Sequence, residues 1–87
     1  MESKKTKRFE NIAKLIKTKR VALGISQNSL AKKVGCEKSG QFISNVERGQ
    51  CSIPLSRLNE YSKSISASKK DLKEAIISDF INHVNSF

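Results

Sequence analysis

The chain has 87 residues, 37% of them hydrophobic and 6% aromatic, with one proline and no tryptophan; it corresponds to one small domain and is not typical of a β-sandwich or a disordered tract. Its 17 lysines and arginines against 8 acidic residues give a formal net charge of +9, which predicts a polyanionic partner. No apolar run approaches the roughly 20 residues that span a membrane, and the N-terminal residues lack the apolar stretch of a signal peptide, so we expect a cytoplasmic protein without a membrane partner.

Residues 1–8 are polar and basic, and we predict a flexible arm because no apolar residue recurs there at a helical spacing. Residues 1–24 hold eight basic side chains against two acidic ones, so this arm and the first predicted helix carry most of the excess charge. The arm contributes four basic residues that are candidates for contacting a polyanion: Lys4, Lys5, Lys7 and Arg8. The alternative interpretation is a solvated terminus that only adds solubility.

A first helix is predicted over residues 8–22, where apolar side chains recur three or four positions apart. It ends before Gly24, which can adopt the positive φ of a residue after a helix. Ser26 is expected to cap a second helix over residues 27–34, because its hydroxyl oxygen can accept from a free amide of the first turn. A turn follows over residues 35–38.

A third helix is predicted over residues 40–48, with Ser39 as its cap and with Phe42 or Ile43 buried together with Val46. A fourth helix is predicted over residues 54–63, since proline suits a first turn where no amide donor is needed. Its expected inward residues are Leu55, Leu58 and Tyr61.

A fifth helix is predicted over residues 69–82, capped by Ser68. Its apolar residues form two neighbouring stripes, one of Leu72, Ile76, Phe80 and Val84, the other of Ile77 and Ile81. This is more apolar surface than one side of a small domain requires. The proposed dimer interface therefore consists of Leu72, Ile76, Ile77, Phe80 and Ile81. The alternative is that this helix only completes the monomer core, and we favour both roles together.

The sequence indicates no metal site, cofactor or catalytic centre. Cys36 and Cys51 are separated by a predicted helix of about ten residues, or roughly 15 Å, whereas a disulfide needs Cα atoms within about 7 Å. There is no CxxC motif, and His83 is the one histidine. Because no acid, base and nucleophile come together, we do not expect an enzyme.

The segments GISQNSLAKKVG and QFISNVERGQCSIP resemble the phage repressor and Cro type of helix-turn-helix proteins, also called the xenobiotic-response-element family. The resemblance covers residues 9–67 and rests on an ordered set: Arg20, Gly24, Ser26-Gln27, Leu30-Ala31, Gly35, Ile43-Ser44, Val46-Glu47 and Gly49. One departure is the stretch from Gly35 to Ile43, which is about two residues longer than is usual in such a turn.

The resemblance implies an all-α, five-helix domain that regulates transcription in a bacterium or phage as a repressor or autoregulator, and it does not imply an enzyme. It implies a homodimer that reads a palindromic operator in double-stranded DNA, with the helix over residues 40–48 in the major groove. The corresponding division of the chain is a basic arm over residues 1–8, a DNA-binding domain over residues 9–67 and a C-terminal helix over residues 68–87.

Polar residues of the third predicted helix are the candidate base readers. Gln41 and Asn45 are one turn apart, so they point the same way, and both amides can pair with adenine. The full set of candidates is Ser39, Gln41, Ser44, Asn45 and Arg48. The candidate phosphate contacts flank the second and third helices and are Ser26, Gln27, Lys38, Gln50 and Ser52.

Arg20 and Glu47 are implied by the same resemblance to form an ion pair between the first and third helices. The chain's alternative function is that of a protein-interaction adapter, or an antitoxin-like module, whose apolar fifth helix binds a second protein. Both functions are compatible with one fold. The polar face of the third helix favours DNA.

Overall fold

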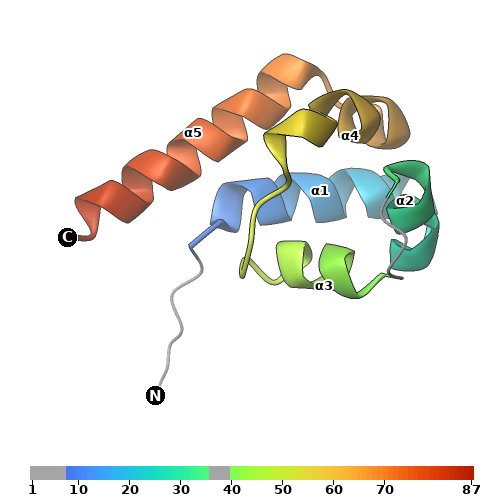
Figure 1. Cartoon of the computed structure of the whole chain (residues 1–87), viewed down its shortest axis with the longest axis horizontal. Coiled ribbons are helices and arrows are strands. Elements are labelled where there is room, and N and C mark those ends of the chain that lie inside the picture. Colours follow the sequence, from blue (N-terminus) through green and yellow to red (C-terminus); the bar gives the residue numbers. More distant parts are fainter. Residues whose placement is uncertain (1–7, 36–39) are drawn as a thin grey trace.

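A computed structural model describes residues 8–35 and 40–87 (Figure 1). These residues form the five helices α1 (Glu10–Ala22), α2 (Gln27–Lys33), α3 (Gln41–Glu47), α4 (Leu58–Ile65) and α5 (Lys69–Asn85), and a 3-10 turn, η1 (Leu55–Arg57), that leads into α4. The predicted all-α, five-helix fold is confirmed. In Figure 1, α1 crosses the middle of the molecule, with α3 on one side of it and α4 and α5 on the other.

The fourth predicted helix differs most from the structure. Pro54 has an extended ψ of 136° and stands outside the helix, and the amide of Arg57 closes a 3-10 turn on the Pro54 carbonyl at 3.0 Å. The regular helix begins only at Leu58 and continues to Ile65, where Ser66 adopts a left-handed φ of 58° and ends it. Leu55, predicted to point inward, is 69% exposed because the 3-10 turn directs it to solvent.

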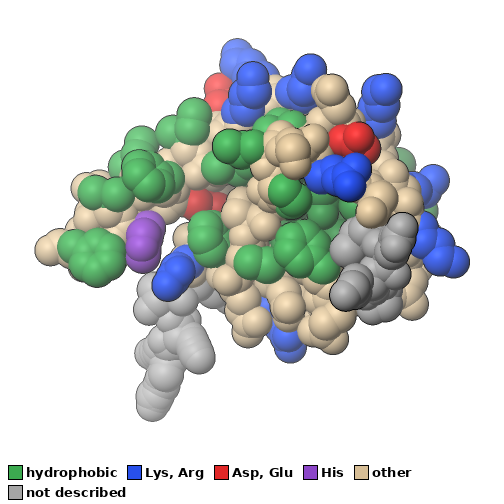
Figure 2. Space-filling view, viewed as in Figure 1, with side chains coloured by type: hydrophobic (Ala, Val, Ile, Leu, Met, Phe, Trp, Pro, Cys, Tyr) green, Lys and Arg blue, Asp and Glu red, His purple; other side chains and the backbone are tan. Residues whose placement is uncertain are grey.

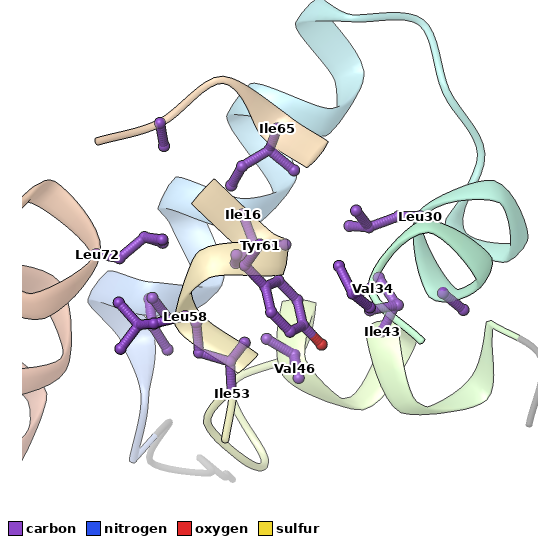
Figure 3. Close-up of a cluster of buried hydrophobic side chains, with 13 residues drawn as sticks. Ile16, Leu30, Val34, Ile43, Val46, Ile53, Leu58, Tyr61, Ile65 and Leu72 are labelled. Carbon is purple, nitrogen blue, oxygen red and sulfur yellow. The ribbon is translucent and has the colours of Figure 1, made fainter. Parts of the chain in front are cut away.

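The core lies where α1, α2, α3 and α4 meet, and Figure 3 shows its side chains converging around Tyr61. The phenol ring of Tyr61 is buried, as are Ile43 and Val46 of α3. Phe42 is half-buried at the edge of this cluster. The core is therefore made mainly of aliphatic side chains, and α3 contributes to it from the side opposite its polar face.

Helix α5 packs on the domain along one face, which includes Leu72 in its first half and Asp79 in its second. Leu72 is fully buried in the core, so it is not available to a dimer interface, and that part of the sequence prediction is wrong. Phe80 is 65% exposed and Val84 50% exposed, although they share a helical stripe with Leu72. Because the buried face of α5 passes through Leu72 and Asp79, Phe80 and Val84 lie to one side of it, where α5 extends past the rest of the described chain (Figure 1).

Asp79 is a buried charge that the sequence analysis did not single out. Its side chain lies against the start of α1, where one carboxylate oxygen accepts from the amide of Asn11 at 2.7 Å and the other from the amide of Ile12 at 2.9 Å. The residue before α1, Phe9, supplies no side-chain cap. A carboxylate from α5 therefore satisfies two free amides of α1 and interacts favourably with the positive end of its dipole.

We predict that Asp79→Asn lowers the free energy of unfolding by about 2 kcal/mol, because an amide turns a donor toward backbone N–H groups that need an acceptor. Urea denaturation followed by circular dichroism measures the loss. Glu74→Gln, the same chemical change at an exposed position of α5, should stay within about 0.5 kcal/mol of the parent. Equal effects of the two changes would show that the Asp79 cap adds nothing.

Candidate nucleic-acid interface

The N-termini of α2 and α3 meet at a close contact. Ser26 caps α2 by accepting from the amide of Ser29 at 3.0 Å. The side-chain oxygen of Asn28 accepts from the amide of Gly40, directly before α3. A Cβ atom on Gly40 would lie 2.8 Å from that Asn28 oxygen and 3.0 Å from the Asn28 backbone nitrogen. A side chain at this position would therefore force Asn28 or the start of α3 to shift, whereas glycine leaves room for the close contact.

An ion pair holds the other end of α3. The Arg20 guanidinium on α1 donates from Nε to Glu47 Oε2 at 2.6 Å and from Nη2 to Glu47 Oε1 at 3.0 Å, which is a bidentate arrangement. These two side chains are 13% and 4% exposed. The hydrogen bond to Glu47 raises the pKa of Arg20 above its ordinary value, so the guanidinium stays charged. These are the two residues that the resemblance paired.

The turn between α1 and α2 joins the same network. Arg20 Nη1 donates to the Ile25 carbonyl at 2.8 Å, and the Gln27 side-chain amide donates to Glu47 Oε1 at 3.1 Å. Three elements of the chain therefore meet at one carboxylate. This fixes the direction in which α3 presents its outer face.

The outer face of α3 carries a chain of hydrogen-bonded polar groups. The Asn45 side-chain oxygen accepts from Gln41 Nε2 at 3.1 Å and from Arg48 Nη2 at 2.8 Å. Gln41 and Arg48 are exposed, while Asn45 and its neighbour Ser44 are half-buried. Four of the five candidate base readers therefore lie on one face of α3, turned away from Ile43 and Val46. The fifth, Ser39, lies outside the described residues.

A polar hollow of about 500 Å³ opens beside this face, at the junction of α2 and α3. It is lined by Ser26, Gln27, Asn28, Gly40, Gln41 and Ser44. Amides and hydroxyls in such a concave site suit an anion or a polar group of a ligand. Two of the candidate phosphate contacts, Ser26 and Gln27, belong to this hollow.

The other candidate phosphate contacts have different surroundings. Gln50 is exposed just after α3. The structure contradicts the prediction that Ser52 contacts a phosphate. Its hydroxyl oxygen is buried and has no hydrogen-bond partner among the described residues, so it does not face a ligand. Lys38 lies outside the described residues.

Of the basic arm, only Arg8 falls within the described residues, and it is exposed. The next residue, Phe9, donates its amide to the Gly49 carbonyl at 3.3 Å. The chain therefore enters α1 beside the C-terminal end of α3. Lys4, Lys5 and Lys7 lie outside the described residues.

Two contacts that position the helices were not predicted from the sequence. Asn28 and Gly40 are 12 positions apart, and Asp79 is 67 positions from Ile12. Neither pair follows a local spacing rule. A clue to the first was the glycine placed directly before the helix over residues 41–47, where an N-capping side chain is usual.

Other sites are sparse in the part of the chain that the structure describes. It contains no group of three or more His, Cys, Asp or Glu residues arranged to hold a metal. No helix among the described residues is long and apolar enough to cross a bilayer. Cys51 is a free thiol whose pKa is raised by burial, which lowers its thiolate fraction. Cys36 lies outside the described residues.

A comparison with protein families identifies part of the chain. The model described as helix-turn-helix matches residues 16–65, from the middle of α1 to the end of α4. This range is more than half of the chain and includes the Arg20–Glu47 ion pair and the polar face of α3. No curated protein and no solved structure matches the chain.

We predict that Glu47→Ala lowers the free energy of unfolding by about 3 kcal/mol, because it leaves the Arg20 guanidinium largely buried without its carboxylate. Chemical denaturation is the measurement. Glu60→Ala is the matched control, since Glu60 and Arg57 are 42% and 47% exposed and 3.9 Å apart and such a pair contributes under about 1 kcal/mol. A Glu47→Ala loss no larger than the control's would mean that apolar packing alone orients α3.

Proposed function

Because this chain belongs to the phage repressor and Cro type of the helix-turn-helix family and is a DNA-binding transcriptional regulator, we propose that it is a repressor or autoregulator that reads a palindromic operator. In this proposal α3 enters the major groove, where every base pair displays a distinct pattern of donors and acceptors. The observation that carries the proposal is the row of hydrogen-bonding side chains along the outer face of α3.

The chemistry of that row suits base readout. The amides of Gln41 and Asn45 can each donate to N7 and accept from N6 of adenine, and Arg48 can donate twice to guanine or contact a phosphate. In the free protein Asn45 already accepts from both neighbours. Exposed bonds of this kind within one helix contribute only about 0.2–0.5 kcal/mol each, so exchanging them for bonds to bases costs little.

Phosphate contacts would fix α3 in register on the duplex. The hollow at the α2–α3 junction offers the Ser26 hydroxyl and the Gln27 amide group, and Gln27 is held in place by its bond to Glu47. Gln50, which is exposed just after α3, would contact a phosphate at the C-terminal end of that helix. Arg8, the last residue of the arm, directly precedes Phe9, whose amide donates to the Gly49 carbonyl at the C-terminal end of α3, and this favours a role of the arm along neighbouring phosphates or in a minor groove.

We further propose that the protein is a homodimer assembled through the projecting half of α5. Four exposed apolar side chains support this, since Ile77, Phe80, Ile81 and Val84 are between 50% and 65% exposed. Ile76 is half-buried at the inner edge of this surface, and Leu72 is excluded because it is in the core. A two-fold axis there would give two α3 helices for the two half-sites of a palindrome.

The alternative function is a protein-interaction adapter or antitoxin-like module that uses α5. The same exposed apolar side chains favour it, since a second protein could cover them instead of a second copy. A second protein that co-purifies at fixed stoichiometry, in a chain that selects no DNA sequence, would replace the operator proposal by this one.

Selection of bound sequences from random duplex DNA, repeated at two salt concentrations, tests the operator proposal. We expect a palindrome with half-site centres about 10 bp or a multiple apart, bound at least about a thousandfold more tightly than random DNA. Weak, steeply salt-dependent binding without an enriched sequence would mean that the net charge gives only non-specific affinity.

Two variants separate base readout from phosphate contacts in this assay. Asn45→Ala should relax the selected sequence at one position of each half-site and cost about 1–3 kcal/mol per half-site, with the salt slope unchanged. Deletion of residues 2–8 should keep the selected sequence and flatten the salt slope. An unaltered sequence with Asn45→Ala would exclude Asn45 as a reader, and an unaltered slope with the deletion would exclude the arm.

We predict that Phe80→Glu combined with Ile81→Glu yields a monomer whose operator affinity falls at least about a hundredfold, because the like charges oppose the interface and one half-site remains unbound. Light scattering gives the molar mass and a mobility shift the affinity. Val21→Glu, at an apolar position on α1 that is 57% exposed, should leave both unchanged. Tight operator binding by a monomeric variant would refute the dimer.

A further inference from the structure

A groove of about 550 Å³ runs between the N-terminal half of α5 and the segment formed by η1 and the start of α4. Its walls and floor are apolar where the two elements meet, with Leu58 buried and Ile76 half-buried. Leu55 on one wall is 69% exposed and Ile77 on the other is 55% exposed. These two side chains would lose most of their contact with water if an apolar side chain lay between them.

The charged side chains that line the groove are both basic. Lys69 and Lys73 line it from the α5 wall, and they are one helical turn apart, so both ammonium groups lie on the same side. Neither forms an ion pair among the described residues, where Arg57–Glu60 and Arg20–Glu47 are the pairs observed. The amino-terminal end of α5, with the positive end of its dipole, lies at the same place.

We propose that this groove docks a segment of another protein in which an apolar side chain is flanked by aspartate or glutamate. The apolar side chain would fill the space between Leu55 and Ile77, and the carboxylates would pair with Lys69 and Lys73. Nucleic acid satisfies only half of this description, since phosphates would pair with the lysines but leave Leu55 and Ile77 in water. The proposal does not depend on the operator.

A second copy of the chain fits the groove less well than a foreign acidic segment. The apolar surface that a second copy would offer is the C-terminal half of α5 with the two residues after it, residues 77–87, whose one acidic residue is Asp79. Asp79 is buried against the start of α1, so it cannot reach the lysines of a neighbour. Figure 2 shows apolar side chains along α5 and a second group over the middle of the molecule, with Lys and Arg side chains around its edge.

The test is a selection from a random peptide library against the full chain, followed by binding measurements with an enriched peptide by fluorescence anisotropy. We expect enriched peptides to combine large apolar residues with Asp or Glu. Leu55→Ala should lower the affinity for the peptide about tenfold. The double variant Lys69→Ala with Lys73→Ala should lower it about fivefold. Lys14→Ala with Lys17→Ala removes the same charge from exposed positions of α1 and should change binding less than twofold.

A peptide whose carboxylates are replaced by amides provides the second control. It should bind the parent about as weakly as the acidic peptide binds the Lys69 and Lys73 double variant. The proposal is overturned if no peptide is enriched, if the enriched peptides lack acidic residues, or if the Lys14 and Lys17 control weakens binding as much as the groove variant. It is also overturned if the groove variants change the molar mass of the protein, or its affinity for DNA, and leave peptide binding intact.

Discussion

The orientation of α3 depends on one carboxylate. Glu47 receives hydrogen bonds from Arg20 on α1 and Gln27 at the start of α2, and the third donor group of Arg20 is taken by the Ile25 carbonyl between those helices. Because α3 has only seven residues, it would be marginal as an isolated helix. Its geometry must therefore come from its neighbours: an apolar contact through Ile43 and Val46, and a polar contact through Glu47.

A second buried carboxylate, Asp79, attaches α5 to α1, as Glu47 attaches α3 to α1. Asp79 accepts from two amides at the N-terminal end of α1, while Arg20 lies near the C-terminal end of the same helix. Helix α1 thus connects α3, which carries the row of polar side chains from Gln41 to Arg48, to α5, which carries the exposed apolar surface. Figure 1 shows these two helices on the two sides of α1. In both contacts a charge that would be costly to bury alone is satisfied by donors from α1.

The sequence predicted the local features of this fold well. Apolar spacing and capping residues placed α2 and the start of α5 correctly, because each depends on neighbours three or four positions away. The predicted start of α4 was four residues too early. Proline suits both the first turn of a helix and the extended residue before one, and Pro54 takes the extended conformation. The outward position of Leu55 and the burial of Leu72 depend on how α4 and α5 pack on the domain, which helical periodicity alone does not determine.

The candidate site follows the same division between local and long-range information. Gln41 and Asn45 were predictable from spacing within one helix, whereas the close contact of Gly40 with Asn28 joins two helices and has no local pattern. Such long-range contacts determine where the polar side chains of α3 are placed. Side chains that read bases must be held at fixed distances from phosphate-binding groups, and here the Gly40–Asn28 contact and the Glu47 network fix α3 at both its ends. In the proposed complex with DNA, the exposed side chains of α3 would exchange their bonds to one another for bonds to bases, while the buried contacts that orient the helix would stay unchanged.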